Sequence, residues 1–397
     1  DENMLKYFDG LVSEQFDKPF ECIGTREEIN AALSKTLEKR TGHLPLLLEK
    51  YKEKFTDETP NSNAELAYEA TQMVIYANTT LILCLLMVIN IHAQEFTDFF
   101  KDKKVLILGF GREGRTTYEF LKNKVPSAEI TVADAKEQKL TSVSPCGCVS
   151  FEPFECKTIF GEHYMDDLGG YDIIMKSPGI PILKDYGEEV ENKITSQTDL
   201  FLRFCPATVI GITGTKGKST TSSLIYHILK KCGRRTRLVG NIGVPVFSDM
   251  ANIKSDTVVV YELSCHQLQY VKASPNIAVL LNVYSDHLDH YRSFEEYRDA
   301  KFNIFKYQTE NDTLIVNSTC ENIDISMFDE AKQHVIFAND KNGCGIDGEN
   351  MYVCGKVVPL ERVKTTLIGK HNLYNISVAL TAAVTAGVPL EEAISAV

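Results

Sequence analysis

The sequence predicts an α/β protein in which two successive units, each built on a parallel sheet, follow a mainly helical segment. Two observations lead to this prediction. From Lys104 onward, short apolar strands alternate with helical patterns, which is the arrangement of a doubly wound parallel sheet. Two connections between a strand and the helix after it are rich in glycine, at 109–114 and 213–219. We therefore expect three domains, which comprise residues 1–102, 103–205 and 206–397.

The composition supports globular domains and excludes some classes of function. The chain has 397 residues, of which 44% are hydrophobic and 24% charged, enough for two or three domains. Its net charge of −12 argues against a nucleic-acid-binding protein, because such proteins hold phosphates with clustered Lys and Arg. The 11 cysteines are scattered, which is typical of free thiols in a reducing compartment. We therefore expect a cytoplasmic protein.

Residues 1–102 show helical patterns and no recognisable chemistry. Thr25-Arg-Glu-Glu28 is a capping-box pattern, which predicts a helix start. The segment Met73–Ala93 is apolar, but its longest unbroken apolar run, Leu81–Ile89, has only nine residues. A bilayer span needs roughly 20. We therefore expect a buried helix there and no membrane span, within an extension of unknown role.

The first glycine-rich connection predicts a nucleotide site. Gly109-x-Gly111-x-x-Gly114 follows the apolar strand Lys104–Leu108 and precedes a helical pattern over Thr116–Lys124. Its glycines allow a tight turn, and the helix start offers free amides to a diphosphate. A second strand ends at Asp134, whose carboxylate could accept from a ribose or a base. This Rossmann-like arrangement usually binds NAD, so an NAD-dependent oxidoreductase is the first hypothesis.

The second glycine-rich connection predicts an ATP site. It follows the strand Thr208–Ile212 and precedes a helix over Thr220–Lys231. The loop departs from the common phosphate-loop pattern, since Ile212 stands where the first glycine belongs. Gly214 and Gly217 nevertheless free the backbone to wrap a phosphate. In the same loop, Lys218 can reach the terminal phosphates and Ser219 can offer a hydroxyl to Mg²⁺.

Further polar residues follow two neighbouring strands. Glu262 comes directly after the strand Val258–Tyr261, where a carboxylate near a phosphate loop suits Mg²⁺. Asp286-His287-Leu-Asp289-His290 follows another strand and is as compatible with surface polar residues as with a metal site. Cys265 has no legible activating partner, so we interpret it as a packed thiol and not a nucleophile.

Taken together, these and later motifs resemble one family. In chain order they are Gly214-Thr-Lys-Gly-Lys-Ser219, Gly240-Asn-Ile-Gly243, Glu262-Leu-Ser-x-x-Gln-Leu268, Asn282-x-x-x-Asp-His287-Leu-Asp289, Ala300-Lys301 and Gly369-Lys-His-Asn372. The order is similar to that of the Mur ligases, which add amino acids to the cell-wall precursor. The first glycine loop, Ser177-Pro-Gly-Ile180 and the serine after Lys218 most resemble the members that add D-glutamate. The resemblance covers about residues 103–397.

The resemblance implies a role for each matching residue. Contacts to the UDP-linked substrate, in place of NAD, would come from Gly111, Arg112, Glu113, Asp134, Ser177, Gly179, Asn241 and Gln267. Contacts to ATP would come from Gly214, Thr215, Lys216, Gly217, Lys218, Ser219, Thr220, Asn372 and Asn375, near His371. Two Mg²⁺ ions would be held, one by Ser219 and Glu262 and the other by His287 and Lys301. The family carbamylates the lysine that matches Lys301, which turns a cation into an oxygen ligand.

The resemblance also implies the reaction. An ATP-dependent ligase would join D-glutamate to UDP-N-acetylmuramoyl-L-alanine through an acyl phosphate, in peptidoglycan precursor synthesis. Its catalytic residues would be Lys218, Glu262, His287 and Lys301, and we expect a cytoplasmic monomer that binds no nucleic acid. No protein nucleophile is needed, in keeping with the interpretation of Cys265.

One departure from the family bears on activity. The family has a third, C-terminal ligase domain, whereas this sequence stops at Val397, about where the central domain would finish. We therefore expect the chain alone to bind the UDP precursor and to ligate poorly. Three alternatives stay open, namely a sister ligase for another amino acid, a nucleotide-binding protein without activity, and the NAD-dependent oxidoreductase.

Overall fold

The computed structural model describes residues 95–397, except 144–148, 287–289, 325, 327 and 329–331. The described residues belong to one compact unit. The predicted helical extension up to residue 94, with its capping box and apolar segment, lies outside the described residues, and so does His287. None of the helices in the described part is long and apolar enough to cross a membrane.

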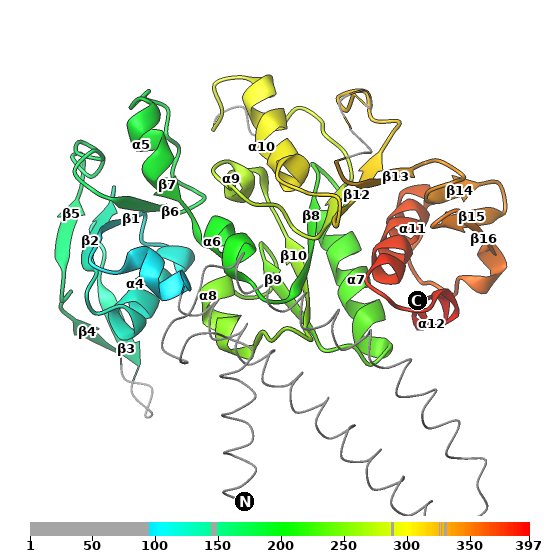
Figure 1. Cartoon of the computed structure of the whole chain (residues 1–397), viewed down its shortest axis with the longest axis horizontal. Coiled ribbons are helices and arrows are strands. Elements are labelled where there is room, and N and C mark those ends of the chain that lie inside the picture. The colour runs from blue at the N-terminus through cyan, green and yellow to red at the C-terminus, as the bar shows by residue number, and fades with distance from the viewer. Residues whose placement is uncertain (1–94, 144–148, 287–289, 325, 327, 329–331) are drawn as a thin grey trace, which may run out of the picture. The chain divides into compact units, whose positions relative to one another are not determined.

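The first sheet is parallel and has five strands in the order β5-β2-β1-β6-β7 (Figure 1). Its strands are β1 (Lys104–Leu108), β2 (Glu129–Asp134), β5 (Lys157–Phe160), β6 (Ile173–Lys176) and β7 (Ile194–Thr195). The helices of this region are α4 (Arg112–Lys124), α5 (Glu188–Lys193) and α6 (Gln197–Phe204), and residues 95–100, before β1, are also helical. A two-stranded antiparallel hairpin is formed by β3 (Leu140–Val143) and β4 (Val149–Glu152). Leu108 pairs with Ala133 on one side and Lys176 on the other, so the carboxyl ends of the three central strands meet.

The second sheet is also parallel and has six strands in the order β13-β12-β11-β8-β10-β9 (Figure 1). Its strands are β8 (Thr208–Thr213), β9 (Thr236–Gly240), β10 (Val258–Glu262), β11 (Ile277–Leu280), β12 (Thr313–Asn317) and β13 (His334–Ala338). The α-helices of this region are α7 (Lys218–Lys231), α8 (Val246–Asp249), α9 (Cys265–Leu268), α10 (Phe294–Lys306), α11 (Lys370–Thr385) and α12 (Leu390–Ala396), with short 3₁₀ turns at η1 (Met250–Asn252) and η3 (Leu360–Arg362). A small antiparallel sheet consists of β14 (Gly345–Asp347), β15 (Asn350–Val353) and β16 (Lys356–Pro359).

Both faces of the second sheet are buried, as expected for a parallel sheet covered by helices. Along β10, Val259 and Tyr261 pack in the core shared with α9 and α10, while Val260 packs in the core shared with α7 and α11. Side chains on a strand alternate between the two faces, which explains why these strands are apolar throughout. The prediction of an α/β protein with parallel sheets is therefore confirmed.

The two helices that follow the glycine-rich connections start earlier than predicted. The sequence favoured starts at Thr116 and Thr220, whereas α4 begins at Arg112 and α7 at Lys218. Glycine serves as the N-cap in both cases, so the polar residues directly after it already belong to the first turn. As a result, the amides of Lys218 and Ser219 belong to a helix N-terminus, where the helix dipole favours anions.

Candidate functional site

The loop between β8 and α7 has the backbone geometry of a phosphate-binding loop. Gly214 and Gly217 have φ values of +154° and +88°, a region that residues with a side chain rarely adopt. A Cβ atom on Gly214 would lie 3.0 Å from Leu281 Cβ and 3.2 Å from the amide of Asn282. The loop therefore depends on glycine at both positions, as the sequence indicated.

Residues at the end of β11 hold this loop in place. The side-chain oxygen of Asn282 accepts from the amide of Lys216 at 2.9 Å, and its amide group donates to the carbonyl of Lys216 at 3.0 Å. The Thr215 hydroxyl lies 2.9 Å from the Tyr297 hydroxyl on α10. Sequence analysis did not propose Asn282 as a site residue, although it opens one of the family motifs. The loop is thus fixed by bonds that involve no ligand, which lowers the entropic cost of binding one.

Two lysines converge on one carbonyl of the loop. Lys218 Nζ donates to the Gly214 carbonyl at 2.8 Å and to the Thr215 carbonyl at 3.2 Å. Lys301 Nζ, from α10, donates to the same Gly214 carbonyl at 3.1 Å. Lys301 is only 2% exposed, and burial lowers the pKa of its ammonium to about 8, with the charge of Lys218 acting in the same direction. At neutral pH, a larger fraction of Lys301 is therefore a free amine than in an exposed lysine.

Glu262 is a fully buried carboxylate beside the phosphate loop. It ends β10 and pairs with Ile212 on β8, the strand that leads into the loop. Its Oε1 accepts from the side-chain amide of Asn241 at 3.0 Å, while its Oε2 is buried and has no hydrogen-bond partner among the described residues. An unpaired buried carboxylate oxygen is costly unless a cation or a donor meets it. Glu262 therefore fits a Mg²⁺ ligand, with Asn241 orienting it.

The start of α11 lies against the phosphate loop. A Cβ atom on Gly217 would lie 3.0 Å from the side-chain oxygen of Asn375. Asn375 in turn donates to the side-chain oxygen of Asn372 at 3.5 Å, and Asn372 donates to the Ile368 carbonyl at 2.8 Å. Asn375, predicted to contact the nucleotide, thus lies beside a glycine of the loop.

The first glycine loop is a tight turn closed by its neighbours. A Cβ atom on Gly114 would lie 2.1 Å from the Gly109 carbonyl oxygen, so the start of α4 packs directly on the turn. The Ser177 hydroxyl donates to the same carbonyl at 2.8 Å. Asp134 accepts from the amides of Phe110 at 2.7 Å and Lys136 at 2.9 Å, so its carboxylate orders the loop backbone. Sequence analysis assigned Asp134 only to the ligand.

Glu113 links the first glycine loop to the second sheet. Its Oε1 accepts from the side-chain amide of Gln267 on α9 at 3.2 Å, and its Oε2 is buried without a hydrogen-bond partner in the described part of the chain. Burial raises the pKa of the Glu113 carboxyl to about 7, against the opposing effects of the Gln267 bond and of Lys176 and Arg112. Arg112 adds a second link, through a 3.3 Å bond to the Gly243 carbonyl.

Lys176 is a buried cation that the sequence analysis missed. It ends β6, is 4% exposed, and donates to the carbonyls of Ser177 at 3.3 Å and Pro178 at 3.4 Å. Burial lowers its pKa to about 8, against the attraction of Glu113. The sequence did offer a signal for this residue, because Lys176 ends an otherwise apolar strand and directly precedes Ser177-Pro-Gly179.

The remaining predicted residues are placed as follows. Gly111, Gly179, Lys216 and Ser219 are exposed, Thr220 is half-buried at the first turn of α7, and His287 lies outside the described residues. The structure therefore gathers the predicted residues around two loops, one per sheet, with bonds between the two groups.

Comparisons with a family model and with known proteins both identify Mur ligases as relatives of this chain. Residues 212–383 match the model of the Mur ligase middle domain. The chain is 38% identical over 296 residues to UDP-N-acetylmuramoylalanine--D-glutamate ligase of Clostridium botulinum (strain Langeland / NCTC 10281 / Type F). The chain belongs to the Mur ligase family. The protein of the same name from Clostridium novyi (strain NT) is 38% identical over 297 residues.

Coverage limits what these relatives imply. Each alignment covers 72% of this chain and 62% of the relative, so the chain spans about three fifths of the relatives' length. A solved Mur-type ligase from Neisseria meningitides, UDP-N-acetylmuramate:L-alanyl-gamma-D-glutamyl-meso-diaminopimelate ligase, is 18% identical with a TM-score of 0.46, over 74% of this chain and 97% of that one. That likeness is too low to add to the family match.

Proposed function

We propose that the protein is an ATP-dependent ligase that joins D-glutamate to UDP-N-acetylmuramoyl-L-alanine in peptidoglycan precursor synthesis. One observation carries this proposal: Lys218 and Lys301 meet at the Gly214 carbonyl, and the buried carboxylate of Glu262 lies on the next strand. Such an arrangement stabilises charge on phosphoryl oxygens and provides no activated nucleophile. The identities of the two substrates, D-glutamate and the UDP precursor, are taken from the names of the relatives given above.

The chemistry of this reaction fits the residues present. A carboxylate is a poor acyl donor, so ATP would first transfer its terminal phosphoryl group to the L-alanyl carboxylate, which yields an acyl phosphate and ADP. The amine of D-glutamate would then attack the acyl carbon, form the amide bond and release inorganic phosphate. Lys218 would exchange its bonds to loop carbonyls for bonds to phosphoryl oxygens, and the amides at the start of α7 would bind the same group. Mg²⁺ would neutralise charge on the phosphates. Ser219 and Glu262 would hold one ion, and Asn241 would keep the Glu262 carboxylate oriented.

Lys301 would hold a second ion together with His287. An ammonium repels a metal ion, so this role requires the lysine to become a carbamate, as the family resemblance implies. Its side chain is buried and aimed at the phosphate loop, where an oxygen ligand would be of use. At the other loop, Glu113, Ser177 and Asp134 would shape the site for the uridine diphosphate.

The test is phosphate release that requires ATP, the UDP precursor and D-glutamate together, in the full-length enzyme. Replacing Lys301→Ala should reduce turnover about 100-fold or more, and short carboxylic acids should partly restore it. Lys306→Ala, in the last turn of the same helix and exposed, is the matched control and should keep activity. Full activity in Lys301→Ala would refute the metal assignment, and equal turnover with other amino acids would favour a sister ligase.

A further inference from the structure

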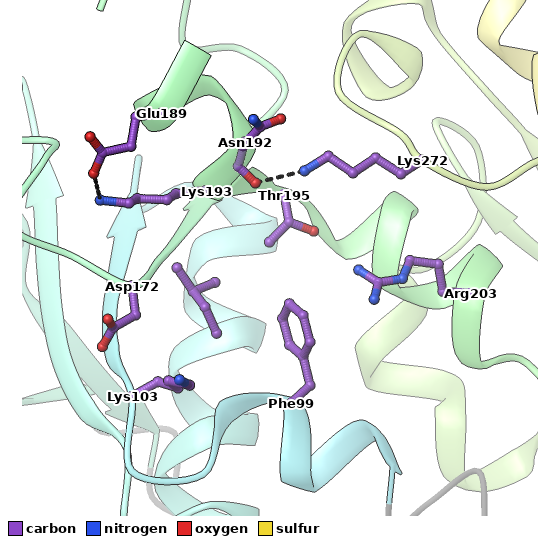
Figure 2. A pocket seen from close by; sticks show the side chains of 10 residues that line it. Phe99, Lys103, Asp172, Glu189, Asn192, Lys193, Thr195, Arg203 and Lys272 are labelled. Carbon is purple, nitrogen blue, oxygen red and sulfur yellow. Dashed lines mark hydrogen bonds and ion pairs between the residues drawn. The ribbon is translucent and has the colours of Figure 1, made fainter. Parts of the chain in front are cut away.

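A cavity lies away from both glycine-rich loops. It has a volume of about 800 Å³ and lies between the first sheet, helices α5 and α6, and the segment after α9 (Figure 2). Lys103 precedes β1 and Asp172 precedes β6, so the cavity is at the amino ends of these strands. The glycine loop follows the other end of β1, which is five residues or about 16 Å long. Nothing in the proposed reaction uses this cavity.

The lining of the cavity is cationic. Four side chains carry positive charge, Lys103, Lys193, Arg203 and Lys272, against the two carboxylates of Asp172 and Glu189. This local surplus stands out on a chain whose net charge is −12. Lys193 pairs with Glu189 at 3.0 Å, and Arg203 lies 3.6 Å from the carboxylate of Asp199. Lys103 and Lys272 are the two lining cations without a carboxylate partner among the described residues, so they are available to an anion.

Two of the cations are held in place with donors to spare. Lys272 Nζ donates to the Asn192 carbonyl at 2.7 Å, across the cavity (Figure 2), which uses one of its three N–H groups. The guanidinium of Arg203 lies 5.0 Å from the centre of the Phe99 ring and 3.6 Å from a carboxylate oxygen of Asp199. A planar guanidinium has five donors, so most of them stay available to an anion.

A buried carboxylate beneath the cavity fixes the backbone behind these side chains. Asp199 is fully buried and accepts from the Lys272 amide at 2.6 Å and from the Thr195 hydroxyl at 2.7 Å. These bonds tie α6 to β7 and to the segment that carries Lys272. Arg203 and the backbone at Lys272 are therefore positioned before any ligand arrives, which reduces the entropic cost of binding.

We propose that this cavity binds a multiply charged organic anion through phosphate or carboxylate groups. Its volume lies within the roughly 300–1,000 Å³ typical of small-molecule sites. Lys103, Arg203 and Lys272 would bind the charged groups, and the Phe99 ring and Ile173 would contact the apolar part. This site is separate from the proposed ligase site, and its ligand would be neither ATP nor the UDP precursor bound at the two glycine-rich loops.

The absence of tryptophan from the sequence allows a local test. In Phe99→Trp, the new indole is the only one in the chain and lines the cavity, so its fluorescence should change on titration with citrate and with pyrophosphate. The stronger of the two probes identifies carboxylate or phosphate as the preferred group. Calorimetry of the unaltered chain with citrate repeats the measurement should Phe99→Trp fold poorly.

Variants locate the binding. Replacing Lys103→Gln and Lys272→Gln together should weaken citrate binding about 100-fold, since each charged hydrogen bond is worth about tenfold in affinity. Lys341→Gln, which removes an exposed lysine paired with Asp347 on the small antiparallel sheet, should leave it unchanged, as should Lys218→Gln in the phosphate loop. No binding of either probe at millimolar concentration, or loss of citrate binding in Lys218→Gln alone, would overturn the proposal.

Discussion

Replacing Glu113→Gln should stabilise the protein at alkaline pH and have little effect at acid pH. Burial raises the pKa of the Glu113 carboxyl from 4.5 to about 7. Folding therefore favours the protonated form, whose stabilising contribution is complete below pH 4.5 and is lost as the pH rises through 7. Glutamine has nearly the same shape, can still accept from Gln267, and never ionises.

The magnitude follows from the size of the shift. A difference of about 2.5 pKa units at about 1.4 kcal/mol each corresponds to about 3 kcal/mol at pH 8, and to less than about 1 kcal/mol at pH 5. The attraction of Lys176 is already contained in the shifted value, because it lowers the pKa of Glu113. For a folding unit of about 300 residues, a stabilisation of about 3 kcal/mol at pH 8 should raise the melting temperature by roughly 5–10 °C.

The assay is thermal unfolding of both chains at pH 5 and pH 8 in the same salt. Glu119→Gln, which removes an exposed carboxylate from the same helix, is the control and should show a small difference at both pH values, because water solvates that group before and after unfolding. If Glu113→Gln instead lowers the melting temperature at pH 8, the charged carboxylate stabilises the fold through Lys176. The reasoning from burial would then be wrong.

Three further changes probe the two loops. Gly114→Ala places a methyl group 2.1 Å from the Gly109 carbonyl, so it should lower the free energy of unfolding by about 1–3 kcal/mol and weaken binding of the UDP precursor in calorimetry. Gly169→Ala, with open space around it, is the control and should change neither quantity. Gly217→Ala imposes a φ of +88° on a residue with a side chain, so it should lower the free energy of unfolding in urea by about 1–2 kcal/mol and weaken ATP binding. An unchanged free energy of unfolding and an unchanged ATP affinity would mean that the loop relaxes. Glu262→Gln should weaken ATP binding about tenfold in Mg²⁺ but not in EDTA, and an equal loss in both would exclude the metal role.

The sequence predicted the α/β class and the positions of strands β1, β2, β8 and β10, because apolar runs and glycine-rich turns are local signals. The structure pairs Glu262 with Ile212 beside the phosphate loop, as the strand-end argument required. The predicted helix starts, Thr116 and Thr220, were too late, because the helical patterns did not show that Gly111 and Gly217 serve as the N-caps.

Other features depend on contacts between distant residues, which no local pattern reveals. The bond from Gln267 to Glu113 spans 154 positions, and the role of Asp134 in ordering the glycine loop depends on where Phe110 lies. Lys176 is buried at the end of β6, an interior strand between β1 and β7, and this strand order cannot be seen in the local sequence. His287 lies outside the described residues, so its place in the site stays a prediction.

The shared Gly214 carbonyl couples the interactions of Lys218 to those of Lys301. Both ammonium groups share one acceptor, so a phosphate that draws Lys218 away leaves that oxygen to Lys301 alone. Conversely, a change of charge at Lys301 alters the field in which Lys218 meets its phosphate. Linkage requires the two effects to be equal in free energy. Under the proposed function, binding of ATP and carbamylation of Lys301 should therefore be coupled, so that each shifts the equilibrium of the other.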